Sequence, residues 1–439
     1  MTDHKTIIVD DDVWPHFNRA SFDQDKLVSF GDYQYGLYWS ADETLILFRR
    51  DLRDDSLQKI RLPYTLTINP TDGHRNTVVG ISPSDGRLHL SWDHHNNDLR
   101  YTKSQAGFIT DPPDHIGVDD FEPAQPLTDG APQKVTYPRF FNDHEDTLHF
   151  IYRTGSSGSG DSVLSRYDAS TGSWSILAEC LFSKEGVYTP WENSDSRNAY
   201  LHDVLFDDTG RLHITWVYRE TGKSPASNHD LHYAWSHDCM IWHNNDGEQI
   251  ADIGSGEPIK LDDPGLVVAD IPVYSWLMNQ CGMTLDRHNQ PHVATFHMQE
   301  PWVPDELVHN PPSHVYDRFY PFHYWRDSDG QWHTSGALQD PTRSIETWGR
   351  QRRPNIVVDQ NGNLIVYYAT DIGYRFHKAN EADRYQSWEH GALTGSEFAA
   401  TDAGKHDRRL LRDSGILSFT AETRDGDRTG FAVLDFEVD

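Results

Sequence analysis

Basic charge, cysteine and long apolar runs are all scarce in this chain of 439 residues. The 38 Lys and Arg residues are outnumbered by 68 Asp and Glu residues, and the formal net charge is −30. Nucleic acid is therefore excluded as the expected partner, because phosphate recognition needs a surplus of cationic side chains. No stretch approaches the roughly 20 consecutive apolar residues of a membrane-spanning helix, so no membrane partner is expected either.

The few cysteines exclude a disulfide framework. The chain has three cysteines, an odd number, and they lie far apart in the sequence at Cys180, Cys239 and Cys281. This usage is typical of a protein from a reducing compartment. The first residues, Met1–Lys5, lack the apolar run of a signal peptide. As printed, the chain is expected to be cytoplasmic; if an export signal has been removed, the expected location is the periplasm or the exterior.

Helical periodicity is also scarce, and 31 Gly and 23 Pro residues interrupt the chain throughout. The hydrophobic share is only 36%, but 14 Trp, 20 Tyr and 19 Phe residues supply enough apolar area for a substantial core. This composition favours an all-β protein.

A short apolar strand after a polar turn recurs along the chain, often preceded by another strand that forms a hairpin with it. The units begin about 43 to 80 residues apart, a spacing compatible with four-stranded blades that carry loop insertions. The pattern predicts a seven-bladed β-propeller. The seven segments are 42–48, 85–92, 145–152, 209–216, 289–296, 361–368 and 414–420.

The propeller is expected to be a single domain over residues 1–439, with the segment 5–9 closing the last blade beside 430–436. Two β-sandwich domains are the alternative. They rank lower because no linker rich in Gly, Ser or Pro divides the chain.

The hairpins predict which residues share one face of the ring. The start of a first strand and the end of its antiparallel partner are neighbours. In the second blade these positions hold His74 and the pair His94-His95, and in the third they hold Tyr137 and Arg153. Two imidazoles, a phenol and a guanidinium are thus expected to converge.

These residue types suit the cleavage of a uronic-acid polysaccharide by β-elimination. The reaction needs a cation to neutralise the carboxylate, a base for the proton on the adjacent carbon and an acid for the leaving oxygen. Arg153 is suited to hold the carboxylate through two hydrogen bonds, while His and Tyr move protons. No cofactor is required for this chemistry.

Long motifs between about residues 70 and 370 resemble the BNR-repeat propellers that include ulvan lyases. The departure from the family pattern is Arg75, which stands where the usual run is His-Asn-Thr. The motifs lie at 73–77, 85–95, 135–140, 152–160, 165–168, 216–221, 228–230 and 279–280.

The resemblance implies an active site made of two histidines about twenty residues apart, a tyrosine, and an arginine sixteen residues after the tyrosine. That pattern falls on His74, His94 or His95, Tyr137 and Arg153, and His94 is favoured over its neighbour. The expected substrate is an anionic, sulfated uronic-acid polysaccharide or oligosaccharide. Further residues expected to bind it are His95, Arg139, Arg219, Asn279, Gln280 and Arg352.

The related lyases also imply a structural Zn²⁺. By the same argument from strand ends, His229, Cys281 and His297 are the expected ligands, with His232 and Cys239 as further candidates.

Three functions remain open on the sequence. The first is a lyase that breaks a rhamnose to uronic-acid linkage, with ulvan as the expected substrate. The alternatives are an exo-acting α-L-rhamnosidase on the same linkage and a carbohydrate-binding propeller without activity. Because the chain carries −30 and the expected substrate is a polyanion, binding must rest on a local cluster of cations and should depend on ionic strength.

Overall fold

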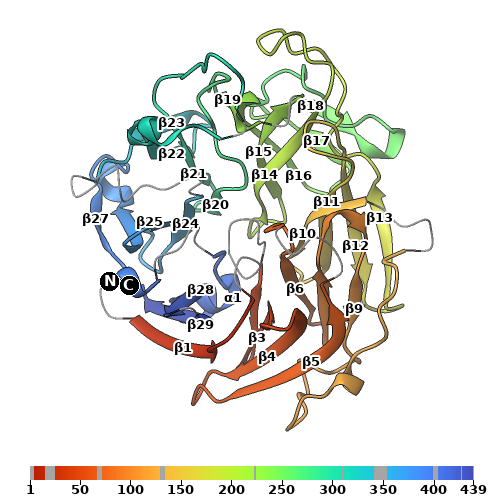
Figure 1. Cartoon of the computed structure of the whole chain (residues 1–439). Coiled ribbons are helices and arrows are strands. Elements are labelled where there is room, and N and C mark those ends of the chain that lie inside the picture. Colours follow the sequence, from red (N-terminus) through yellow and green to blue (C-terminus); the bar gives the residue numbers. More distant parts are fainter. Residues whose placement is uncertain are drawn as a thin grey trace.

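The computed structural model describes residues 4–14, 25–66, 72–128, 134–221, 224–308, 310–340, 353–398, 404–426 and 428–438. Their strands form seven sheets arranged in a ring, a seven-bladed β-propeller (Figure 1). The predicted fold class is confirmed.

The first four blades occupy the first half of the ring. The first contains β2 (Leu27–Phe30), β3 (Tyr33–Trp39), β4 (Thr44–Asp51) and β5 (Leu57–Thr65). The second contains β6 (Thr77–Ser82), β7 (Arg87–Trp92) and β9 (Tyr101–Lys103). The third contains β8 (His95–Asp98), β10 (Lys134–Asn142), β11 (Leu148–Arg153), β12 (Ser162–Asp168) and β13 (Ser173–Ala178). The fourth contains β14 (Arg197–Phe206), β15 (Leu212–Glu220), β16 (Asn228–Ser236), β17 (Ile241–His243), β18 (Gln249–Asp252) and β19 (Val267–Ala269).

Three more blades complete the ring. The fifth contains β20 (Gly282–Leu285), β21 (Pro291–Met298), β22 (Phe319–Arg326) and β23 (Trp332–Ala337). The sixth contains β24 (Asn355–Val358), β25 (Leu364–Thr370), β26 (Gly373–Ala379) and β27 (Glu389–Ala392). The seventh contains β28 (Ile416–Asp425), β29 (Arg428–Glu437) and β1 (His4–Asp10). Short 3₁₀ helices lie at Val118–Asp120, Pro225–Ser227, Ile253–Ser255, Ser313–Arg318, Glu381–Asp383 and Ser396–Phe398.

The two ends of the chain close the ring. β1 pairs antiparallel with β29, with Ile7 opposite Val433, as expected for the segments 5–9 and 430–436. Five of the seven predicted strands are the second strands of the main hairpins of their blades, namely β7, β11, β15, β21 and β25, whereas 42–48 falls on β4, the third strand of the first blade. The seventh prediction, 414–420, falls on β28, the first strand of the last blade, because the helix α1 (Arg408–Ser414) precedes it.

The core lies between the faces of adjacent sheets. Trp39 of the first blade and Leu88 of the second are fully buried in one such layer, and similar apolar layers separate the other blades. Both faces of a blade are covered by neighbouring blades, so its central strands are buried on both sides. In β25, for example, every residue is buried. No helix of the described residues is long and apolar enough to cross a membrane.

The ring axis is filled by α1 and by buried charges. Asp407 caps α1 by accepting a hydrogen bond from the Leu410 N–H. Arg408 donates to Asp203 at 2.7 Å and to Asp25 at 3.2 Å, which joins the last blade to the fourth and the first. These ion pairs hold the inner strands in place, and the inner strands carry the site described next.

Candidate functional site

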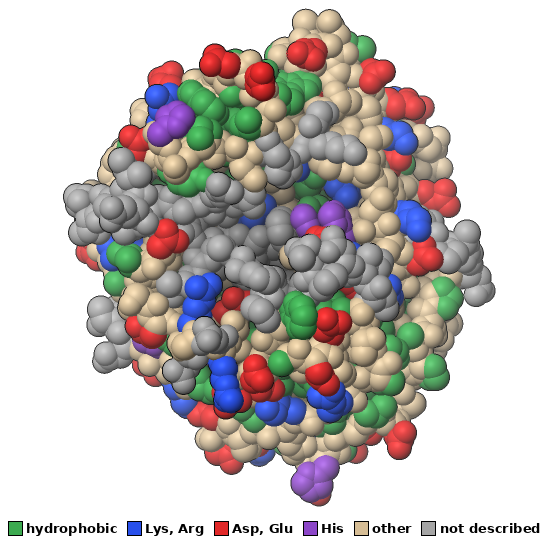
Figure 2. Space-filling model, in the orientation of Figure 1, with side chains coloured by type: hydrophobic (Ala, Val, Ile, Leu, Met, Phe, Trp, Pro, Cys, Tyr) green, Lys and Arg blue, Asp and Glu red, His purple; other side chains and the backbone are tan. Residues whose placement is uncertain are grey.

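The ends of strands from neighbouring blades meet on one face, as the hairpin argument predicts. Thr77, the first residue of β6, is opposite Trp92, the last of β7. Thr136 of β10 is opposite Arg153, the last residue of β11, and on its other side it is opposite His95. Histidine surface is visible near the middle of this face in Figure 2.

Asp72 holds two histidines side by side. The Nδ1 atom of His74 lies 2.6 Å from Asp72 Oδ1, and that of His95 lies 2.5 Å from Asp72 Oδ2. The two imidazole rings stack with their centroids 4.0 Å apart and an angle of 12° between them. Their side chains are 28% and 35% exposed, so both are open to solvent.

The charges in this cluster follow from burial and hydrogen bonding. Burial would raise the pKa of Asp72, but the hydrogen bonds from His74 and His95 hold it well below its usual range. Burial lowers the pKa of His74 to about 4, although Asp72 opposes the shift. With Nδ1–H donated to the carboxylate, a neutral imidazole carries its lone pair on Nε2 and can accept a proton there.

The favoured member of the histidine pair is corrected by the structure. His94 is fully buried, with Nε2 3.0 Å from Ser91 Oγ and 3.2 Å from the Arg100 backbone N–H that donates to it. The physical reason is the chain reversal at Asp93, whose φ is 62°. It turns His94 back under the blade and lets His95 begin β8 beside β10, where it meets His74.

Tyr137 faces the histidine cluster from a β-bulge. The register of β10 against β11 shifts between Thr136 and Arg139, and Tyr137 has a left-handed φ of 55°. Its ring centroid lies 6.0 Å from that of His74. The guanidinium of Arg153 lies 5.2 Å from the centre of the Tyr137 ring. Bulges of this kind re-aim a side chain and are common next to active sites.

Tyr200 is a site residue that the sequence analysis missed. Its hydroxyl accepts hydrogen bonds from Arg153 Nη1 at 3.2 Å and from Arg219 Nη1 at 3.1 Å. Burial acts to raise the pKa of Tyr200, but the two guanidinium groups lower it below its ordinary value. Tyr200 lies near the start of β14 in the fourth blade, as Tyr137 does near the start of β10 in the third, so its strand-end position is visible in the sequence.

Three of the expected binding residues come together around Arg219. Arg219 Nε donates to Asn228 Oδ1 at 2.7 Å, and Nη2 donates to Asn279 Oδ1 at 2.8 Å. The Asn279 amide donates in turn to Gln280 Oε1 at 2.6 Å. Gln280 borders a small cavity of about 30 Å³, which Tyr137 also lines.

Arg139 does not belong to this set. Its Nη1 donates to the buried Asp203 Oδ1 at 2.5 Å, so its charge is neutralised inside the ring and the structure removes it from the residues expected to bind substrate. Arg352 lies outside the described residues. The neighbouring Arg353 is buried and donates from Nε to the Asn279 carbonyl at 2.8 Å, which brings another cation to the site.

The expected zinc ligands do not share a site. His229 is held between Asp230 at 2.9 Å and Glu220 at 3.1 Å, whereas His297 contacts the Met298 carbonyl and the Tyr324 hydroxyl. The Cys281 thiol donates instead to the Met278 carbonyl. The prediction rested on the positions of these residues at strand ends of neighbouring blades. In the structure each potential ligand atom has a different partner, so this trio does not fit a zinc ion.

One group of three potential metal ligands is found among the described residues, and it lies elsewhere. It consists of Asp72, His74 and His95, whose ligand atoms all lie within 4.8 Å of one another. The further candidates His232 and Cys239 are buried and are not part of it.

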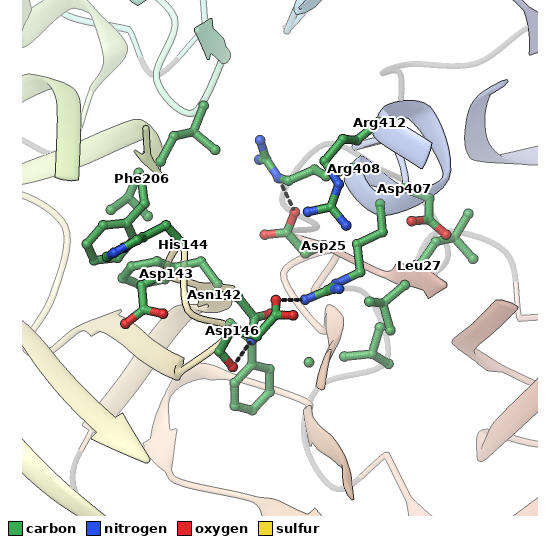
Figure 3. Close-up of a pocket in the computed structure, with 18 of the residues that line it drawn as sticks. Asp25, Leu27, Asn142, Asp143, His144, Asp146, Phe206, Asp407, Arg408 and Arg412 are labelled. Atoms are coloured by element: carbon green, nitrogen blue, oxygen red, sulfur yellow. Dashed lines mark hydrogen bonds and ion pairs between the residues drawn. The ribbon is translucent and has the colours of Figure 1, made fainter. Parts of the chain in front are cut away.

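A separate cavity of about 440 Å³ is lined by residues that include Asp25, His144 and Arg408 (Figure 3). It is bordered by Asn142 and Phe206, the last residues of β10 and β14, whereas Tyr137 and Tyr200 lie near the starts of these strands. Two of its arginines are paired with lining carboxylates, Arg408 with Asp25 and Arg409 with Asp146, and acidic residues outnumber basic ones in the lining. This cavity is therefore separate from the candidate site and offers no excess of cations.

Fold and site together define a seven-bladed β-propeller protein whose imidazole, phenol and guanidinium groups meet on one face of the ring. A family model described as a BNR repeat-containing family member matches residues 33–339. The match covers more than half of the chain, and the protein belongs to this family.

Curated relatives are similar over part of their length. An ulvan lyase, long isoform, from Alteromonas sp. (strain LOR) is 26% identical over 265 residues, 51% of this chain and 26% of the relative. The corresponding protein of Glaciecola sp. (strain KUL10) is 22% identical over 319 residues, 62% of this chain and 31% of the relative. The chain therefore spans about a quarter to a third of the length of these relatives.

Solved structures share the fold over nearly the whole chain. The polysaccharide lyase Uly1 is 17% identical with a TM-score of 0.68, covering 95% of this chain and 90% of its own. A PL25 ulvan lyase bound to -[GlcA(1-4)Rha3S]- is 12% identical with a TM-score of 0.70, covering 98% and 95%. At these identities the likeness establishes the propeller fold.

Proposed function

We propose that the protein is a polysaccharide lyase that cleaves a uronic-acid polysaccharide of the ulvan type by β-elimination. The observation that carries the proposal is one juxtaposition: the paired imidazoles of His74 and His95 face the Tyr137 phenol, with the Arg153 guanidinium beside that phenol. The names of the relatives support the same reaction.

Arg153 is the group that binds the uronate carboxylate in this proposal. Its Nη1 donates to Tyr200, while its buried Nε has no hydrogen-bond partner among the described residues. A buried donor without a partner is costly, and an anionic ligand would satisfy it. Arg219 and Arg353 add positive charge close by, so the site attracts an anion although the whole chain carries −30.

The proton steps use the imidazoles and the phenol. A histidine Nε2 of the cluster removes the proton from the carbon next to the carboxylate, and the electron pair forms the new carbon–carbon double bond. The bond to the leaving oxygen breaks, and that oxygen takes the Tyr137 hydroxyl proton. Burial raises the pKa of Tyr137, which keeps the phenol protonated and ready to donate. The second histidine and Arg153 stabilise the charge on the carboxylate in the transition state.

The substrate is proposed to carry sulfated rhamnose, since one structural relative was solved with -[GlcA(1-4)Rha3S]- bound. Incubation with ulvan tests the proposal. A lyase produces an unsaturated uronate that absorbs in the ultraviolet, in step with new reducing ends. New reducing ends without this absorbance would indicate a rhamnosidase instead, and binding of ulvan without any product would indicate a non-catalytic propeller.

A further inference from the structure

Asp72, His74 and His95 form a donor set that the proposed reaction does not exhaust. Two imidazoles and one carboxylate are the ligands that divalent transition metals such as Zn²⁺ prefer, whereas Mg²⁺ and Ca²⁺ prefer oxygen alone. Both Nδ1 atoms point at the same carboxylate, at 2.6 and 2.5 Å.

The geometry is compact enough for one ion. The three ligand atoms lie within 4.8 Å of one another, and zinc bonds to nitrogen and oxygen of about 2.0 to 2.2 Å need ligand atoms roughly 3 to 3.5 Å apart. The cluster is also open to solvent, since the side chains of His74 and His95 are 28% and 35% exposed.

Nearby cations oppose metal binding, among them Arg75 beside Asp72 and Arg353 near His74. Arg75 Nη2 lies 3.4 Å from Asp72 Oδ2. The same guanidinium lies 3.3 Å from the buried Asp93 through Nη1, so its charge is shared between two carboxylates. The imidazole pair therefore remains the dominant feature that a metal ion would meet.

We propose that Asp72, His74 and His95 bind one divalent transition-metal ion, such as Zn²⁺, in place of substrate, and that this ion inhibits the enzyme reversibly. The inhibitory part rests on the proposed function, because the ion would occupy the imidazoles that move protons. The binding part stands on the donor set alone.

Calorimetric titration of the tag-free protein with ZnCl₂, after removal of metals with a chelator, tests the binding part. The expected result is one equivalent bound by the wild type and at least tenfold weaker binding in both His95→Ala and Asp72→Asn. His333→Ala is the matched control, because His333 pairs with the single carboxylate of Asp327 at 2.6 Å outside the cluster. Equal zinc binding by the wild type and both cluster variants would overturn the assignment.

The inhibitory part is measured with ulvan as substrate. Zn²⁺ at the concentration that saturates the site should abolish formation of unsaturated uronate, and a chelator should restore it, while Mg²⁺ and Ca²⁺ leave the rate unchanged. Saturation with zinc at an undiminished rate would overturn inhibition. If the metal-free protein never cleaves ulvan, the proposed function fails, and the titration still decides the metal site.

Discussion

His74 precedes the β6–β7 hairpin of the second blade and His95 follows it, and the two meet at its open end as a stacked pair, with ring centroids 4.0 Å apart. The carboxylate of Asp72 lies between their Nδ1 atoms. Each imidazole is therefore fixed in orientation by one oxygen of the same side chain. This arrangement gives Asp72 a defined role in the proposed reaction, as a residue that positions the two groups moving or stabilising charge.

Asp72→Asn should lower kcat by about tenfold to a hundredfold, since a general base or acid contributes roughly a hundredfold or more. An amide has one accepting oxygen, so only one of the two Nδ1–H groups can keep its hydrogen bond. The rate of unsaturated uronate formation from ulvan measures the effect. Asp327→Asn, at the pair with His333 outside the site, is the control and should keep full activity. An unchanged kcat in Asp72→Asn would contradict the positioning role.

Tyr137→Phe should reduce kcat by about a hundredfold or more with little change in KM, because the ring remains and only the proton donor is lost. Tyr33→Phe, in the first blade, should behave as the wild type, since Tyr33 stacks with Arg49 and Arg53 away from the site. Kinetics with ulvan and a thermal unfolding curve for each variant provide the measurement. A folded Tyr137→Phe enzyme with normal kcat would exclude this phenol as the acid.

The seven-bladed ring and the convergence of His74, Tyr137 and Arg153 could be predicted because they depend on short-range patterns. Hairpin pairing determines which strand ends are neighbours, and the number of recurring apolar runs gives the number of blades. Which of His94 and His95 faces the site depends on the left-handed φ of Asp93, a backbone choice that no residue pattern revealed.

The partners of buried side chains were also beyond prediction. Arg139 stands at the expected strand, but its charge is taken by Asp203 from the next blade, 64 residues away. The zinc trio was wrong for a different reason, because His229 pairs with two carboxylates of its own blade, those of Asp230 and Glu220. Strand ends can be placed from sequence, whereas the direction of a side chain and its closest partner depend on packing between blades.

The KM for ulvan should pass through a minimum as NaCl is raised. At about 0.01 M salt the Debye length is about 30 Å, so the net charge of −30 repels a polyanion across the whole surface. At about 0.15 M it is about 8 Å, and repulsion is screened while the contacts to Arg153 and Arg219 persist. Still higher salt weakens those contacts. A short oligosaccharide with few charges should show a shallower minimum, and a KM independent of salt for both substrates would contradict this electrostatic balance.

Stability should fall as the pH drops below about 6.5, because several histidines outside the site are buried in neutral form. Burial lowers the pKa of His202 and His232 to about 3 and that of His297 and His377 to about 4. Between pH 6.5 and these values the unfolded chain binds protons that the folded chain does not. Each such histidine lowers the free energy of unfolding by up to about 1.4 kcal/mol per pH unit.

Urea unfolding at a series of pH values from about 7.5 to 4.5 measures this dependence. His232→Phe should reduce the slope of the unfolding free energy against pH by the contribution of one histidine, because the titrating nitrogens are removed. The replacement keeps an aromatic ring, which preserves the stacking on Trp216. His288→Phe is the matched control, since it makes the same replacement at an exposed histidine, which lies beside Glu381. A flat profile for the wild type across this range would show that the buried histidines become protonated without unfolding the propeller.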